Sequence, residues 1–253
     1  MSVNRQTLLQ CCEELLNPAA FKDYCPNGLQ VEGGDSIQRL VAGVTANQLL
    51  IDQAIEQKAD AVLVHHGFFW RGEDPCISGI KQRRIKALLD NNINLIAYHL
   101  PLDAHPTLGN NARLAHLLGI SISDGLEAGN PHSVGNIGYL TQPVAAQDFC
   151  QLVAKALQRE PVLVNAGDHP IKTIGWCTGG AQGYLTQAAV RGVDAYLSGE
   201  ISESTVHDAR ELGVHYIAAG HHATERYGVQ AVGQYLAEKF QLDYQYIDIG
   251  SPA

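Results

Sequence analysis

Short apolar runs that end in glycine or histidine alternate with segments of helical period along most of the chain. A continuous apolar run of strand length predicts a strand that is buried on both faces. Such strands alternating with amphipathic helices are typical of βαβ units and of a mainly parallel sheet. The sequence therefore predicts an α/β protein.

Two series of these elements follow one another in the same order. In the first series we expect strands at 40–45, 61–64 and 95–99, joined by helices at 48–57 and 80–91. In the second we expect strands at 171–177, 195–197 and 216–219, joined by helices at 185–191 and 205–212.

The two series align with each other at one register. Asp60-Ala61 aligns with Asp194-Ala195, and the strand after Asn94 aligns with the strand after His215. Any two βαβ units share apolar strands, so duplication and coincidence both remain open. We expect duplicated βαβ-type lobes that face a shared cleft, because ligands of open α/β sheets bind beyond the carboxyl ends of the strands.

Between the two series lies a segment that reads as an inserted β-α-β piece, with strands at 136–140 and 162–165 and a helix at 146–157. Turn-rich stretches flank it. The expected organisation is a first α/β lobe, an inserted segment and a second α/β lobe that pack as one compact unit, with bounds at 1–125, 126–170 and 171–253.

Composition narrows the class of protein. No apolar run approaches the roughly 20 residues that span a bilayer, and the N-terminus lacks the pattern of a signal peptide. The six cysteines form no CxxC pair, so we expect reduced thiols and a cytoplasmic location. The net charge of -9 argues against nucleic-acid binding, whereas a small anionic substrate stays compatible with bound divalent cations.

Histidine pairs follow two of the apolar runs. His65-His66 ends a predicted strand, and Gly220-His221-His222 follows another. Adjacent residues of a strand point to opposite sides, so a vicinal pair at a strand end favours two metal ions over one. Imidazoles suit iron, zinc, manganese, cobalt or nickel, and carboxylates add oxygen ligands that can bridge two ions.

Carboxylates complete both histidine sets. Asp103 follows the strand at 95–99, and Glu225 lies four residues after His221, at the helical spacing that puts both side chains on one face. We expect two divalent metal ions on five ligands, namely His65, His66, Asp103, His221 and Glu225. We expect His222 to point elsewhere.

Other polar residues provide weaker signals. His99 is either a hydrogen-bonded histidine at a strand end or the residue that transfers a proton. Glu200 either borders the cleft or is an ordinary turn residue. A structural role is expected for the remaining histidines, namely His105, His116, His132, His169, His207 and His215. The glycine-rich stretch 177–183 matches neither a dinucleotide-binding motif nor a P-loop, and we expect a tight turn.

Five motifs resemble those of the NIF-three-like proteins, also called type-2 homologues of GTP cyclohydrolase I. They are Asn27-Gly28-Leu29-Gln30-Val31, Val64-His65-His66-Gly67-Phe68-Phe69-Trp70, Ala97-Tyr98-His99-Leu100-Pro101-Leu102-Asp103, Ser198-Gly199-Glu200 and Ala219-Gly220-His221-His222-Ala223-Thr224-Glu225. The resemblance covers nearly the whole chain in order.

The resemblance implies a duplicated α/β fold with a dinuclear metal site and assembly into a toroidal homohexamer. It also implies that His66 and Asp103 hold one metal, that His65 and His221 hold the other, and that Glu225 bridges them. Longer relatives carry an additional inserted domain, and the short middle segment of this chain indicates the compact form.

Three functions fit these features. The first is a metal-dependent hydrolase of cyclohydrolase type that acts on a nucleotide or another small molecule, with GTP suggested by the family's name. The second is a metal-binding or metal-delivery protein, or a ring-shaped scaffold, without catalysis. The third is a di-iron redox enzyme.

Overall fold

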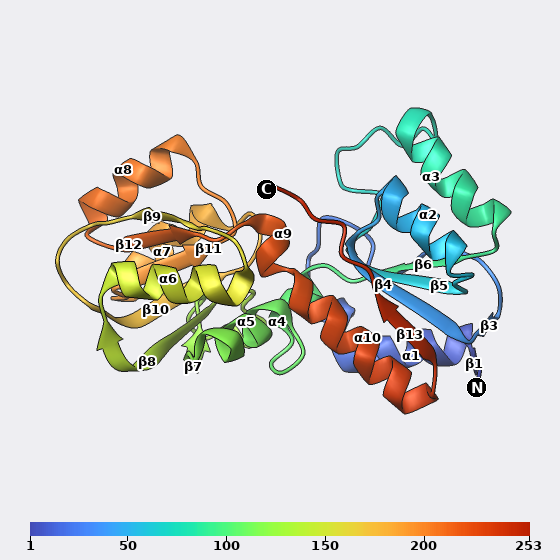
Figure 1. Ribbon diagram of the computed structural model, residues 1–253, viewed down its shortest axis with the longest axis horizontal. Coiled ribbons are helices and arrows are strands. Elements are labelled where there is room, and N and C mark those ends of the chain that lie inside the picture. The colour runs from blue at the N-terminus through green and yellow to red at the C-terminus, as the bar shows by residue number, and fades with distance from the viewer. The chain divides into compact units, whose positions relative to one another are not determined.

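The computed structural model describes residues 1–253, and contacts divide them into two compact units (Figure 1). Unit 1 consists of Met1–Leu102 and Gly228–Gly250, and unit 2 consists of Asp103–Tyr227 and Ser251–Ala253. These bounds differ from the three segments that the sequence suggested. The C-terminal helix and strand belong to unit 1, and the strands of the middle segment belong to the main sheet of unit 2.

Unit 1 is built on a five-stranded sheet with the order β13-β4-β5-β6-β2. Its strands are β4 (Arg39–Thr45), β5 (Ala61–His66), β6 (Asn94–Ala97), β13 (Asp243–Tyr246) and β2 (Gly28–Val31). The first four are parallel, and β2 runs antiparallel to β6 at the edge. A separate two-stranded pair joins β1 (Val3–Asn4) to β3 (Ser36–Ile37).

Helices cover both faces of this sheet. They are α1 (Arg5–Leu16), α2 (Gln48–Glu56), α3 (Gly79–Asp90) and α10 (Arg226–Phe240), and a short 3-10 turn, η1, follows α1 at Pro18–Ala20. In Figure 1, α2 and α3 lie on one side of the sheet, and α1 and α10 lie on the other. Val62 and Val64 pack against Leu50 and Ile51 of α2, whereas Leu63 between them is equally buried. Burial on both faces explains the continuous apolar runs of the sequence.

Unit 2 contains a six-stranded sheet with the order β7-β8-β10-β11-β12-β9. Its strands are β7 (Ser121–Gly125), β8 (Asn136–Val144), β9 (Val162–Val164), β10 (Ile171–Cys177), β11 (Ala195–Ser198) and β12 (His215–Ala218). The central strands β10, β11 and β12 are parallel, and β8 and β9 run antiparallel beside them.

Two cores lie on opposite faces of the unit 2 sheet. The helices of this unit are α5 (Asn110–Leu118), α6 (Ala146–Leu157), α7 (Leu185–Val190), α8 (Glu203–Leu212) and α9 (His221–Thr224), with a 3-10 turn, η2, at Gln182–Tyr184. Leu197 packs in one core with Phe149 of α6, whereas Tyr196 packs in the other with Leu185 of α7. The chain passes from one unit to the other within α4 (Leu100–Ala104) and again within α10.

The predicted α/β fold is confirmed, including the order of both series. The helix expected at 146–157 and the strand expected at 171–177 have the predicted bounds, and the other elements of the two series differ by only a few residues. The edge strands β2, β7 and β13 were not predicted, because half-exposed strands lack a continuous apolar run.

The two units share a repeated substructure. Ala61 pairs with Leu40 and with Asn94 in unit 1, and Ala195 pairs with Ile174 and His215 in unit 2. These pairs follow the register at which the two sequence series align. In each unit an antiparallel edge strand also lies beside the third parallel strand, namely β2 beside β6 and β9 beside β12.

One aspartate ties the amino ends of the strands together in each unit. The Asp60 carboxylate accepts hydrogen bonds from the backbone N–H groups of Gln38 and Arg39, at 2.8 Å each. Asp194 accepts from the N–H groups of Lys172 at 2.9 Å and Thr173 at 2.7 Å. The same contact at the same register in both units favours duplication over coincidence.

No helix of the structure is long and apolar enough to cross a membrane. The six cysteines are free thiols, and five of them are buried. Buried apolar cores and hydrogen bonds stabilise each unit.

Replacing Asp194 with alanine should destabilise the protein by about 1–3 kcal/mol, because two backbone N–H groups and the Thr173 hydroxyl lose their acceptor. Denaturant unfolding followed by circular dichroism measures this loss. Asp208→Ala is the control, because Asp208 lies exposed on α8.

The stability difference between wild type and Asp194→Ala should shrink in acid. Burial by itself would raise the pKa of Asp194, but hydrogen bonds from Thr173 and Lys172 outweigh burial and lower the pKa. A carboxyl whose pKa is lower in the folded state contributes stability above its unfolded pKa of about 4 and loses it as the pH falls further. An undiminished difference at acid pH would contradict this assignment.

Candidate metal centre

Three histidines of unit 1 gather where parallel strands end. His65 and His66 are the last residues of β5, and His99 follows β6 by two residues. One nitrogen from each ring lies within 4.8 Å of the other two. The ring centroids of His65 and His66 are 4.5 Å apart, and those of His65 and His99 are 5.1 Å apart. The structure thus brings His99 into one cluster with the predicted pair.

The Nδ1 atom of each of these histidines has a fixed partner. His65 Nδ1 donates to the carbonyl oxygen of Tyr98 at 3.0 Å. His66 Nδ1 lies 3.1 Å from the hydroxyl oxygen of Thr45, and His99 Nδ1 lies 2.6 Å from a carboxylate oxygen of Asp23. Histidines that bind metals almost always engage their second ring nitrogen in this way. Nε2 is therefore the nitrogen with which His65 and His66 would bind an ion.

In unit 2, His221 lies between two carboxylates. Its Nδ1 donates to Glu200 at 2.7 Å, and its Nε2 lies 3.1 Å from Glu225. His221 and Glu225 thus contact each other, as their spacing of four residues predicts. Glu225 is only 3% exposed. A buried carboxylate beside an imidazole is a pair that fits a divalent cation.

The two carboxylates also change the acidity of His221. Burial opposes the charged imidazolium and would lower its pKa, but Glu225 and Glu200 outweigh burial and raise the pKa of His221 to about 9. The imidazole thus lies in a strongly negative environment. Such an environment attracts cations.

Asp103 is a second buried carboxylate of unit 2, with 4% exposure. Its Oδ1 accepts hydrogen bonds from Asn110 Nδ2 at 2.8 Å and from the Thr178 hydroxyl at 3.2 Å. Asn111 holds the same segment, because its amide donates to the Asp103 carbonyl at 3.3 Å. These hydrogen bonds fix the orientation of the Asp103 carboxylate.

Two glycines let the backbone approach these side chains. Gly179, with φ of +70°, follows β10, and a Cβ there would overlap the Glu225 carboxylate and lie 3.2 Å from His221 Nε2. Gly220 has φ of +96°, and the Arg159 side chain packs directly against it. Gly179 of the glycine-rich stretch therefore makes room for the Glu225 carboxylate and the His221 imidazole, in addition to turning the chain.

The donor set fits a metal in both units. Unit 1 offers neutral nitrogen donors, and unit 2 offers carboxylate oxygens and one imidazole. Such a mixture suits first-row transition metals and zinc. His65 and His66 end β5, Asp103 follows β6, and His221 and Glu225 follow β12. All five predicted ligands therefore lie at or after the carboxyl end of a strand, where α/β proteins bind ligands.

Three of the remaining histidines have contacts elsewhere in unit 2. His215 stacks on His169 at 4.1 Å between ring centroids, accepts from the Ala166 N–H and bonds the His169 carbonyl. These contacts lie at the amino end of the unit 2 sheet and fit the expected structural role. His207 pairs with Glu203 on an exposed helix face.

Several residues that hold the candidate ligands could not be singled out in the sequence. Thr45, Asn110 and Thr178 bond candidate ligands, and Asp23 bonds the neighbouring His99. Glu200 is a partner of His221 instead of an ordinary turn residue. Most of their partners are distant in the sequence, so no local pattern marks them. Two motifs of the sequence do lie at or near these residues: the motif 27–31 follows Asp23 closely, and the motif 198–200 contains Glu200.

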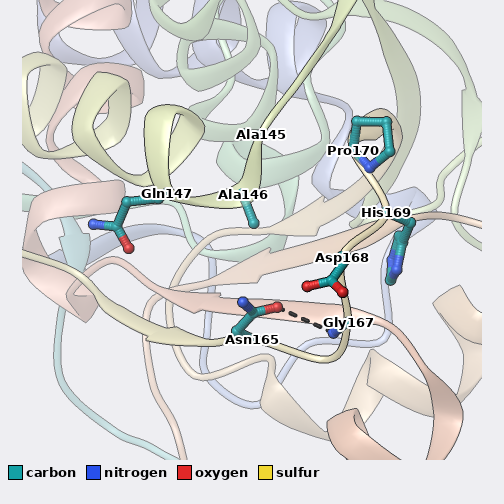
Figure 2. A pocket seen from close by; sticks show the side chains of 8 residues that line it. All are labelled: Ala145, Ala146, Gln147, Asn165, Gly167, Asp168, His169 and Pro170. Atoms are coloured by element: carbon teal, nitrogen blue, oxygen red, sulfur yellow. Dashed lines mark hydrogen bonds between the residues drawn. The ribbon is translucent and has the colours of Figure 1, made fainter.

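A surface hollow of about 270 Å³ lies elsewhere in unit 2 (Figure 2). It is lined by residues at the start of α6 and by the loop before β10, namely Ala145, Ala146, Gln147, Asn165, Gly167, Asp168, His169 and Pro170. This loop leads into the amino end of β10, whereas the candidate ligands follow the carboxyl ends of strands. The hollow therefore contributes nothing to the metal centre.

The fold and the clustered histidines and carboxylates define an α/β protein with metal-binding potential. The family model described as Duf34/NIF3 (NGG1p interacting factor 3) matches residues 3–251, so the chain belongs to this family.

Relatives and solved structures agree with this assignment. A protein of Pseudomonas aeruginosa named GTP cyclohydrolase 1 type 2 homolog is 56% identical over 253 residues, which is 100% of both chains. The solved structure of a protein called ybgI, described as of unknown function, is 49% identical with a TM-score of 0.95, covering 99% of this chain and 100% of that one. The crystal structure of TTHA1606 from Thermus thermophilus is 31% identical with a TM-score of 0.90, at the same coverage.

Replacing Gly179 with alanine should weaken metal binding more than it weakens the fold. The added methyl group displaces the flexible Glu225 carboxylate, whereas the left-handed backbone costs about 1–2 kcal/mol at any such site. Gly213→Ala is the matched control, because Gly213 has φ of +66° and open space around it.

We expect both variants to lose similar stability in thermal unfolding, and only Gly179→Ala to lose about tenfold or more in affinity for Zn²⁺. Equal Zn²⁺ affinities in a competition titration would show that Glu225 takes no part.

Proposed function

We propose that this protein holds two divalent metal ions on His65, His66, Asp103, His221 and Glu225, and that it is a metal-dependent hydrolase of cyclohydrolase type. The observation that carries the proposal is the fixed Nδ1 partner of each candidate imidazole. Histidines that bind metals almost always engage their second ring nitrogen in this way.

Two of the proposed ligands lie close in the chain to points at which it passes from one unit to the other. The chain passes between the units at Leu102–Asp103 and again at Tyr227–Gly228. Asp103 is part of the first passage, and Glu225 lies two residues before the second. Within the proposal, His66 and Asp103 hold one ion, His65 and His221 hold the other, and Glu225 bridges the two.

The residues of the chain have distinct tasks in the proposed reaction. Two metal ions held by these residues would supply a nucleophile near neutral pH by acidifying water, and would stabilise negative charge on the reacting group. Glu200, Thr45 and the Tyr98 carbonyl orient the ligating imidazoles. His99 lies in the same cluster as His65 and His66, and it accepts the proton.

The substrate class is a nucleotide or another small cyclic molecule. The Pseudomonas aeruginosa relative carries the name of a GTP cyclohydrolase homologue, which supports a ring-opening hydrolysis. The negative charge of the chain does not oppose an anionic substrate, because bound cations reverse the local field.

A homohexameric ring is part of the proposal. Large apolar side chains are exposed on α2, on α3 and just before α3, and burial against another copy would remove them from water. They are Leu49, Ile77, Ile80 and Leu89. Sedimentation velocity would distinguish a hexamer from a monomer.

Elemental analysis of protein purified without added metal or chelator tests the metal site. We expect near two equivalents of metal per chain in wild type and a marked loss in Glu225→Ala, because a bridging carboxylate serves both ions. Glu203→Ala is the control, since Glu203 is exposed and pairs with His207 on the surface of α8. Negligible metal in wild type, with no uptake on reconstitution, would refute the proposal.

Turnover tests the hydrolase assignment. Metal-loaded wild type should convert at least one member of a panel of nucleotides, esters and cyclic amides, and the chelated protein should convert none. Release of bound metal should be slower than turnover, because a catalytic ion is retained. A metal that exchanges freely in a protein without activity would favour a metal-delivery role.

A further inference from the structure

Asp23 lies in the loop between η1 and β2, and each oxygen of its carboxylate accepts two hydrogen bonds. Oδ1 accepts from the Tyr24 N–H and from His99 Nδ1, at 2.6 Å each. Oδ2 accepts from Asn27 Nδ2 and from the Leu100 N–H, at 2.9 Å each. The Asp23 side chain is only 4% exposed.

Three of these four donors cannot change their role. The N–H groups of Tyr24 and Leu100 belong to the backbone. The Asn27 side-chain amide is oriented because its Oδ1 accepts a hydrogen bond from the backbone N–H of His99 at 2.8 Å. The carboxylate itself stays ionised at neutral pH. Burial would raise the pKa of Asp23, but hydrogen bonds from His99 and Asn27 outweigh burial and lower it to about 2.

Neighbouring rings hold the His99 imidazole in place. The Trp70 ring packs edge-on at 4.9 Å between centroids, and the His66 ring lies 5.7 Å away. With Nδ1 donating to Asp23, the lone pair of the ring belongs to Nε2. His99 is also the histidine of the unit 1 cluster whose Nδ1 partner is a carboxylate, whereas His65 and His66 have neutral partners.

A carboxylate on Nδ1 has two effects. It selects the tautomer with the proton on Nδ1, and it stabilises the imidazolium that forms when Nε2 takes a second proton. A neutral carbonyl or hydroxyl partner provides much less of the second effect. The Asp23–His99 pair is therefore suited to accept a proton.

We infer that Asp23 is a positioning residue that fixes His99 in the tautomer with the proton on Nδ1, so that Nε2 accepts a proton beside His65 and His66. The tautomer stands on the geometry of unit 1 alone. The identity of the proton donor, a water activated by bound metal, rests on the proposed function.

Asparagine at position 23 should reverse the tautomer. Its amide nitrogen must replace either Oδ1 or Oδ2, and both positions face backbone N–H donors. Of the two partners at Oδ1, only the His99 imidazole can change its role. When its proton moves to Nε2, Nδ1 can accept a hydrogen bond from the new amide nitrogen. The reversal thus relieves part of the conflict in Asp23→Asn.

The test is a long-range ¹H–¹⁵N correlation spectrum of imidazole-labelled, metal-free protein at about pH 8, where unperturbed imidazoles are neutral. We expect a protonated Nδ1 for His99 in wild type and a protonated Nε2 in Asp23→Asn. Glu203→Gln is the matched control, because it alters an exposed carboxylate–histidine pair and should leave the His99 signals unchanged. An unchanged His99 tautomer in folded Asp23→Asn, with a loss of stability alone, would overturn the inference.

Metal content separates the proton acceptor from a ligand. His99→Gln should retain the metal content of wild type, whereas loss of an ion would make His99 a ligand and overturn the inference. If wild type takes up no metal, the proposed function fails, and the tautomer measurement still decides the role of Asp23. If Asp23→Asn does not fold, Asp23→Glu, which keeps the carboxylate, should restore the wild-type tautomer, and failure to do so would count against the inference.

Discussion

Strand register is the constraint on which the candidate site depends. Asp60 and Asp194 each bind two backbone N–H groups at the amino end of a neighbouring strand, so they fix how the first two strands of each repeat pair. A slip of one residue would turn every side chain to the opposite face. It would also remove His65, His66 and the glycine before His221 from the ends where they meet their partners. The aspartates at the amino ends of the strands thus help to determine where the candidate ligands lie at the carboxyl ends.

The repeat carries different chemistry in its two copies. In unit 1 the strand ends deliver imidazoles, and in unit 2 they deliver glycines, an imidazole and carboxylates. At the aligned position of His66, unit 2 has Glu200, which orients His221 instead of following the histidine pattern. The duplicated frame thus presents nitrogen donors in one copy and mainly carboxylate oxygens in the other, and both kinds of donor suit first-row transition metals.

Two of the four clustered imidazoles are oriented by neutral groups and two by carboxylates. A backbone carbonyl, a hydroxyl and two carboxylates serve this purpose for His65, His66, His99 and His221. Because the charge of the partner changes how readily a ring accepts a proton, residues of the same type can serve as ligand or as base. Asp23, which is buried, and Glu200, which is 43% exposed in its side chain, differ in how strongly solvent screens them.

The sequence by itself determined the α/β class, the order of both series and the histidine pairs, because buried parallel strands and amphipathic helices leave a local periodic signal. It also placed His221 and Glu225 together, since four residues make about one helical turn. Only the tertiary structure decided that Asp23 holds His99, that Thr178 holds Asp103, and that α10 and β13 complete unit 1. Hydrogen bonds between residues 75 or 76 positions apart follow from packing, and no local pattern in a single sequence records them.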